Sequence, residues 1–187
     1  MTELLIKGMV CDRCRRAVAR DLVQLGLTVG AVELGRVEVL QWPDKVSQET
    51  IRTTLQAEGF DLIDDPKTSL AEQIKGLLIN EVHHVHQRPD YQNMSDFLSY
   101  KLGYDYSYLS QLFSAQTGTT IERFLILQKI ERAKELLQYG ERRIADIAFD
   151  LGYSSVPHFS NQFRSIVGST PARFRKVPAG RQTLDTL

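Results

Sequence analysis

The sequence lacks any long apolar run, and this absence excludes a class of protein. Among its 187 residues, no hydrophobic stretch approaches the roughly 18 residues that a membrane-spanning helix needs. The first residues, Met1 to Lys7, also lack the basic segment and long apolar core of a signal peptide. We therefore expect a cytoplasmic protein with no membrane partner.

Cysteine is almost absent as well. The chain has two cysteines, Cys11 and Cys14, which are too few and too close together for a framework of structural disulfides. In a reducing compartment, two thiols at this spacing indicate a pair of metal ligands or a redox pair.

The chain carries no net charge, with 23 basic and 23 acidic residues. It therefore lacks the overall basic balance that favours nucleic acid. The distribution is uneven, however, because residues 151–183 contain five basic side chains and no acidic one. A local basic patch is sufficient for phosphate contacts even on a neutral protein.

An internal repeat occupies the C-terminal half. Leu102-Gly103-Tyr104 matches Leu151-Gly152-Tyr153 at an offset of 49, and after one inserted residue the offset becomes 50. The further matched pairs are Leu109 with Phe159, Ser110 with Ser160, Phe113 with Phe163, Gly118 with Gly168 and Thr120 with Thr170. Each copy indicates a helix, a glycine turn and a second helix, which is the pattern of a helix-turn-helix.

The second helix of each copy has recognisable start signals. Asp105 and Ser155 stand where an N-cap is needed, and we expect their side-chain oxygens to accept hydrogen bonds from backbone amides. Pro157 falls in a first turn, where its missing N–H is not required. The spacing predicts a buried face, formed by Leu109, Leu112, Phe113, Phe159 and Phe163.

A further helix is predicted between the two copies, from Ile121 to Gln138, and Gly140 ends it. We expect this helix to hold the two copies at a fixed separation. Their recognition helices would then enter successive major grooves, about 34 Å apart.

Two segments of this half resemble the AraC family of transcription regulators. They are Ile144 to Tyr153, continued by Ser169 to Arg175, and Lys129 to Leu137. The resemblance covers about residues 70–176. It implies an all-α domain of about seven helices with two helix-turn-helix units. Such a domain regulates transcription at promoters as a monomer or homodimer, and its partners are double-stranded DNA and RNA polymerase.

The resemblance also implies which residues contact DNA. The base-contacting positions correspond to Ser107, Tyr108, Ser110, Gln111, Pro157, His158 and Asn161. We expect the phosphate contacts from Lys129, Arg164, Arg173 and Arg175.

The first 66 residues have a different pattern. Short strands are predicted at residues 4–6, 27–34, 36–40 and 61–63, with helices ending near Gly26 and spanning residues 48–58. The order βαββαβ predicts an α+β, ferredoxin-like sandwich. We therefore expect one domain at residues 1–66 and a second at 67–187, with helix-turn-helix units at about 95–118 and 144–168. Pro66 marks the boundary, and Thr68 or Ser69 can cap the next helix.

Cys11 and Cys14 lie between a loop and a helix N-terminus, so both thiols can face one ion. The helix dipole and Arg13, Arg15 and Arg16 are expected to favour the thiolate form. Two soft ligands suit Cu(I), or else Hg(II) or Zn(II). The segment Gly8-Met9-Val10-Cys11-Asp12-Arg13-Cys14 also resembles the heavy-metal-associated domain over residues 3–65, which implies metal binding by the two cysteines.

Several alternatives stay open. The thiols could form a reversible redox switch, or the sandwich could sense another ligand or only mediate contacts. The chain could also be a metal carrier whose helical half docks partners, or a small thiol oxidoreductase. No Ser/His/Asp set, phosphate loop or paired carboxylates indicate other catalysis, and we expect no enzyme. His83, His84 and His86 are expected to be ordinary helix residues.

Overall fold

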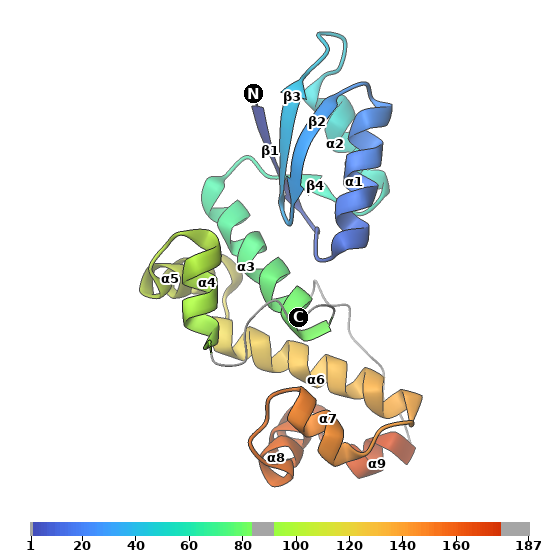
Figure 1. The fold of residues 1–187 in the computed structure, drawn as a ribbon, viewed down its shortest axis with the longest axis vertical. Helices are drawn as coiled ribbons and strands as arrows, with labels where there is room; N and C mark the ends of the chain where they lie inside the picture. The colour runs from blue at the N-terminus through green and yellow to red at the C-terminus, as the bar shows by residue number, and fades with distance from the viewer. Residues whose placement is uncertain (1, 84–91, 177–187) are drawn as a thin grey trace. The chain divides into compact units, whose positions relative to one another are not determined.

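The computed structural model of the protein describes residues 2–83 and 92–176. These residues form two compact units that divide between Ile121 and Glu122. Figure 1 traces the order of the elements along the chain. Each unit contains one of the two helix-turn-helix pairs, so each is described by itself.

The first unit begins with the expected ferredoxin-like sandwich. Its elements are β1 (Thr2–Lys7), α1 (Asp12–Gln24), β2 (Thr28–Glu33), β3 (Arg36–Gln41), α2 (Gln48–Ala57) and β4 (Asp61–Leu62). The strands form one sheet in the order β2-β3-β1-β4, and each neighbouring pair is antiparallel. The predicted βαββαβ order is therefore confirmed, with the last strand reduced to two residues.

The core of the sandwich follows from alternation along the strands. Leu4 and Ile6 in β1 and Val37 and Val39 in β3 are buried, and the residues between them are more exposed. Successive side chains of a strand point to opposite faces, so these four residues share one face of the sheet. The apolar faces of α1 and α2 complete this core with the buried residues Val18, Leu22, Ile51 and Leu55.

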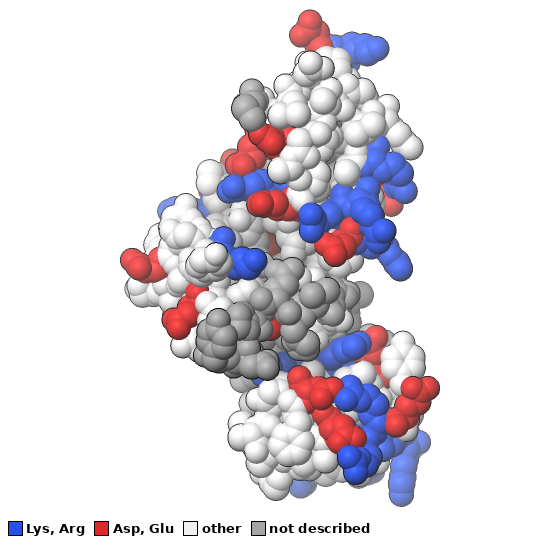
Figure 2. Space-filling view, viewed as in Figure 1, with Lys and Arg blue, Asp and Glu red and all other residues white. Residues whose placement is uncertain are grey.

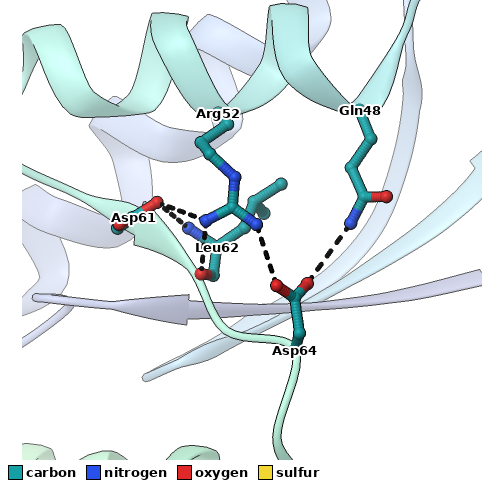
Figure 3. A network of polar contacts seen from close by, with 5 residues as sticks. All are labelled: Gln48, Arg52, Asp61, Leu62 and Asp64. Carbon is teal, nitrogen blue, oxygen red and sulfur yellow. Dashed lines mark hydrogen bonds and ion pairs between the residues drawn. The ribbon is translucent and has the colours of Figure 1, made fainter.

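Arg52 of α2 fixes the end of the sandwich (Figure 3). Its guanidinium donates to Asp61 Oδ1 at 2.9 Å and to Asp64 Oδ2 at 3.0 Å. Gln48 Nε2 donates to the other oxygen of Asp64 at 3.4 Å. The last strand and the segment after it are thus tied to one helix, which sets where the next helix begins.

That next helix, α3 (Pro66–His83), is capped by Asp65 rather than by Thr68 or Ser69. The backbone amide of Thr68 donates to Asp65 Oδ2 at 2.9 Å, and its hydroxyl donates to the same oxygen at 2.7 Å. The expected cap was wrong because the helix starts at Pro66 itself, where proline is tolerated in the first position. Thr68 is then already inside the first turn.

Helix α3 contacts both β1 of the sandwich and α5 of the first helix-turn-helix. The contacts of the chain divide into two compact units after Ile121. The expected domain boundary near residue 66 stays a prediction. Whether residues 67–187 fold alone stays a prediction.

The remaining helices are α4 (Met94–Leu102), α5 (Tyr106–Thr117), α6 (Ile121–Tyr139), α7 (Ile144–Asp150), α8 (Val156–Val167) and α9 (Pro171–Lys176). Together with α3 they are seven helices within the described ranges, as the resemblance implied. None of the described helices is both long enough and apolar enough to cross a membrane.

Candidate nucleic-acid interface and thiol pair

The first helix-turn-helix is α4, a glycine turn and α5. Asn93 caps α4, because its Oδ1 accepts the backbone amide of Asp96 at 2.8 Å. Gly103 ends α4 with a φ of 73°, in the left-handed region that costs glycine little. Asp105 occupies the N-cap position of α5, but its side chain makes no capping hydrogen bond. The position of the cap was predicted correctly, and the expected hydrogen bond was wrong.

The second helix-turn-helix is α7, a turn at Gly152 and α8. Ser155 caps α8 as expected, since its hydroxyl oxygen accepts the backbone amide of His158 at 3.3 Å. Pro157 lies in the first turn. Phe159 and Phe163 are fully buried, with ring centroids 5.7 Å apart, and Phe163 packs edge-on against Phe174 of α9 at 5.5 Å. This aromatic cluster fixes the orientation of α8.

The opposite faces of α5 and α8 are solvent-exposed and carry no acidic side chain. The predicted base-contacting residues lie on these faces: Ser107, Tyr108 and Gln111 on α5, and Pro157, His158 and Asn161 on α8, are exposed, and Ser110 is half-buried. The expected core residues Leu109, Leu112 and Phe113 face the other way and are buried. Each helix therefore presents a polar surface with hydrogen-bonding groups while its apolar face holds it in place.

Residues 98–177 match a protein family described as a helix-turn-helix domain. An uncharacterized HTH-type transcriptional regulator of Staphylococcus aureus is 33% identical over 92 residues, which cover 49% of this chain and 12% of that protein. The HTH-type regulator YtdP of Bacillus subtilis (strain 168) is 26% identical over 129 residues, covering 68% of this chain and 17% of that protein. The chain thus spans less than a fifth of the length of these relatives.

Solved structures have the same helical fold. One is the C-terminal domain of AraT, a response regulator from Geobacillus stearothermophilus. It is 21% identical, the match covers 63% of this chain and 90% of that domain, and the TM-score is 0.51. An AraC-type transcriptional regulator from Chromobacterium violaceum is 26% identical, with coverages of 61% and 96% and a TM-score of 0.48. Residues 98–177 of this chain are therefore similar to the helix-turn-helix domains of HTH-type transcriptional regulators. Its relatives are transcription regulators and not enzymes.

Within the helical domain, the four predicted phosphate-binding residues differ in exposure. Arg164 and Arg173 are exposed, so their guanidinium groups are available to a ligand. Arg175 is half-buried and donates to the backbone carbonyl of Arg142 at 2.7 Å. Lys129 is half-buried too, with its ammonium 5.5 Å from the ring centroid of Tyr153. The first two are better placed for phosphate contact, and all four assignments stay predictions.

The surface charge is mixed rather than uniformly basic (Figure 2). On the face shown, Lys and Arg gather over the first half of α1, which carries Arg13, Arg15 and Arg16, and they alternate with acidic side chains in the second unit. Arg142 pairs with Asp150, and Arg143 pairs with Asp146 at 2.9 Å. Part of the basic charge of the second unit is thus neutralised within the protein.

Sequence reasoning missed a pair of aromatic contacts at the turns. Tyr104 lies 5.4 Å from Tyr108 between ring centroids, and Tyr153 lies 5.4 Å from His158. The repeat makes these pairs equivalent, since Tyr104 matches Tyr153 and Tyr108 stands opposite His158. The repeat itself was the available signal, because an aromatic residue recurs at the turn and a second recurs in the next helix.

The thiol pair lies where β1 leads into α1. Cys11 is the N-cap residue of α1, and its sulfur is 3.4 Å from the sulfur of Cys14; both residues are half-buried. With metal–sulfur bonds of about 2.3 Å, two sulfurs on one ion are at most about 4.6 Å apart. The two sulfurs therefore already lie within the span that one ion can bridge.

The protonation of Cys14 differs from the expectation. Burial, together with the neighbouring Cys11 thiol, raises the pKa of Cys14. Arg15 does not offset this effect, because its guanidinium donates to Asp12 Oδ1 and to the Val32 carbonyl, both at 2.9 Å. The expected preference of Cys14 for the thiolate form was wrong, because burial of the thiol raises its pKa.

The loop between β1 and α1, Gly8 to Cys11, is called the Cys loop below, and it is in close contact with α3. A Cβ atom at Gly76 would lie 3.2 Å from the Met9 carbonyl oxygen and 3.5 Å from Leu34 Cβ. Glycine is thus the residue that lets α3 approach the loop preceding Cys11. Helix α3 therefore touches the segment that positions the thiols.

No group of three or more His, Cys, Asp or Glu side chains in residues 2–83 and 92–176 is arranged to hold a metal ion. His83 is buried at the end of α3 and has an interaction partner, as expected of an ordinary helix residue. His84 and His86 lie outside the described residues. Any metal site built from the described side chains would therefore rest on the two cysteines.

Proposed function

We propose that this chain is a transcription regulator that binds promoter DNA in a sequence-specific manner through α5 and α8. The observation that carries the proposal is the repeated exposure of a polar face on a helix whose apolar face is buried in a helix-turn-helix. Both helices have a left-handed glycine at their C-terminal end, Gly118 and Gly168. Each is therefore a short, rigid element of the kind that enters a major groove.

Gln111 and Asn161 supply the sequence preference in this proposal. Both are exposed, and neither amide is held by a hydrogen bond within residues 2–83 and 92–176. A free amide can pair bidentately with adenine, which discriminates against other bases by about 1–3 kcal/mol. Arg164 and Arg173 would contact phosphate and add affinity without sequence preference.

The test is a set of single variants whose DNA affinity is measured over a range of salt concentrations on a selected operator and on scrambled DNA. Gln111→Ala and Asn161→Ala should lose preference for the operator, while Arg164→Ala should weaken both DNAs equally and reduce the salt slope by about one unit. Gln138→Ala, an exposed glutamine on α6, is the matched control. Unchanged affinity and preference in Asn161→Ala would show that α8 is not a recognition helix.

The proposed signal is a soft metal ion held by Cys11 and Cys14. Two supports are the separation of the sulfurs, 3.4 Å, and the absence, among the described residues, of a third His, Cys, Asp or Glu side chain grouped with them. Two thiolates alone suit a soft ion of low coordination number, Cu(I) before Zn(II) or Hg(II). The ion would supply a charge and a fixed geometry between the two sulfurs. The residues of the loop would then transmit that geometry to α3 at Gly76.

Metal control of DNA binding is tested by titrating the operator with apo, Cu(I)-loaded and Zn(II)-loaded protein under reducing conditions. Allosteric coupling of about 1–3 kcal/mol corresponds to a 5- to 150-fold change in affinity. The Cys11→Ser/Cys14→Ser variant should bind DNA like the apo protein in every condition. Equal DNA affinity and equal transcription in vitro from all samples would reject metal sensing and leave DNA binding untouched.

The same thiol separation supports a second candidate signal, which is oxidation of the pair to a disulfide. Low-coordinate metal binding and disulfide formation both need two facing sulfurs. The two signals differ in their reversal, because a thiol reductant restores the oxidised protein and a chelator restores the metal-loaded one. A change of DNA affinity that responds only to the reductant would support the redox switch.

A further inference from the structure

A polar cavity of about 290 Å³ lies inside the first unit, between the sandwich and helices α3 and α4. Its lining includes Arg15 of α1, Glu33 of β2, Gln73, Leu77 and Asn80 of α3 and Lys101 of α4. The three α3 residues are spaced four and three apart, so they form one face of that helix. The cavity is thus bounded by the same helix that touches the Cys loop.

Asn80 is the residue that distinguishes this cavity from an ordinary surface groove. It is only 7% exposed, and its amide makes no hydrogen bond with any residue in the described ranges. The amide atoms of Asn80 are not among the fully buried polar atoms that lack a partner, so they remain accessible from the cavity. An accessible amide offers a ligand both a donor and an acceptor.

The charges around the cavity are of both signs. Arg15 is engaged by Asp12 and by a backbone carbonyl. Lys101 and Glu33, in contrast, form no ion pair with any side chain in residues 2–83 and 92–176. The ammonium of Lys101 lies 5.9 Å from the ring centroid of Phe97, a contact that leaves its N–H donors available. A cation and an anion that lack ion-pair partners in the described residues are complementary to a ligand that carries both charges.

The size of the cavity and the apolar part of its lining restrict the class of ligand further. Binding cavities for larger ligands span about 300–1,000 Å³, so this one suits only a small molecule. Leu34, Leu77 and Leu102 form the apolar part of its wall. We propose that the cavity binds a small zwitterion of the free amino acid class, with its carboxylate toward Lys101, its ammonium group toward Glu33 and a hydrogen bond from or to Asn80. The lining includes neither the proposed DNA-contacting residues nor the thiols themselves, but Asp12 and Arg15 in the lining follow Cys11 and Cys14 directly in the chain.

The proposal is tested on the full chain without DNA, so that its outcome is independent of the proposed function. Each proteinogenic amino acid is screened by thermal shift, and the strongest binder is measured by titration calorimetry. The N-acetyl and the amide derivatives of that amino acid, which lack one charge each, are measured beside it. We expect one amino acid or a chemically related group to bind, and each derivative to bind at least about tenfold more weakly.

Three variants locate the binding. Lys101→Ala and Glu33→Ala change exposed side chains and should each weaken binding about tenfold or more, as should Asn80→Leu, which removes the buried amide. Lys45→Ala and Glu49→Ala, two exposed residues away from the cavity, are the matched controls and should bind normally. The proposal is overturned if no amino acid binds, if the singly charged derivatives bind equally well, or if binding survives Lys101→Ala and Glu33→Ala.

Discussion

The two helix-turn-helix units have the same pattern of sequence but differ at their turns. In the second unit Tyr153 is 6% exposed, its hydroxyl donates to Gln162 Oε1 at 2.6 Å, and its ring packs 5.2 Å from Phe159. Burial raises the pKa of Tyr153 to about 12. In the first unit the equivalent Tyr104 is 49% exposed. The same residue type is therefore a core residue in one copy and a surface residue in the other.

The units also differ in charge and in their attachment. Arg164 extends from α8, whereas α5 has no basic residue at all. The first helix-turn-helix packs through α5 on α3, and α3 also contacts β1 of the sandwich. Under the proposed function, the second helix-turn-helix, which carries Arg164, would contact DNA phosphates, and the first, which packs on α3, would receive a signal from the sandwich.

The largest expected effect tests the aromatic core of the second unit. Phe163→Ala removes a fully buried ring that contacts Phe159 and Phe174, and should lower the free energy of unfolding by about 3–5 kcal/mol. Phe149→Ala is the matched control, because Phe149 lies in the same unit and is 59% exposed. Urea denaturation measures both. A loss below about 1 kcal/mol in Phe163→Ala would contradict the packing described for α8.

The next effect concerns the contact between α3, on which the first helix-turn-helix packs, and the sandwich. Gly76→Leu forces a large side chain against the Met9 carbonyl and Leu34, and should destabilise the protein by about 1–3 kcal/mol. Gly76→Ala should cost less, because alanine favours the helix by about 1 kcal/mol. Denaturation of the two variants gives this order. Equal stability of Gly76→Leu and the wild type would mean that α3 and the Cys loop are not in close contact.

A smaller effect separates the two turn tyrosines. Tyr153→Phe leaves Gln162 Oε1 without its donor and should cost about 0.5–1.5 kcal/mol of unfolding free energy. Tyr104→Phe should be close to neutral, because Tyr104 is exposed and its ring remains in place. Both variants are compared by chemical denaturation. The difference between the units would disappear if the two substitutions cost the same.

The smallest expected effect concerns the pH dependence of the cap on α3. Hydrogen bonds from the hydroxyl and the backbone amide of Thr68 lower the pKa of Asp65. A carboxyl whose pKa is lower in the folded state stabilises the protein above its unfolded pKa of about 3.9. That contribution is lost as the pH falls through the folded value.

Asp65→Asn should therefore flatten the stability profile at acidic pH, and Asp44→Asn, an exposed carboxyl with no described hydrogen bond, serves as its control. Thermal melts across the acidic range measure the profile. The capping assignment fails if both variants keep the wild-type acid dependence.

Much of the fold followed from local patterns. The repeat of Leu-Gly-Tyr predicted two helix-turn-helix units because a left-handed turn between two helices favours glycine in any context. Ser155 was recognised as a cap for a similar reason, since a cap needs only its own following turn. Asp105 and the cap of α3 were predicted less well, because small shifts in where a helix begins change which side chain faces the free amides.

The sequence by itself determined the βαββαβ order, the two helix-turn-helix units, the buried faces of α5 and α8 and the nearness of Cys11 to Cys14, because each depends on residues close together in the chain. Only the tertiary structure decided that α3 joins the sandwich to the first unit, that Arg15 turns to Asp12 and Val32, that Tyr153 is buried while Tyr104 is not, and that Asn80 faces a cavity. These features depend on which distant segments pack together, and spacing along a chain carries no direct record of that.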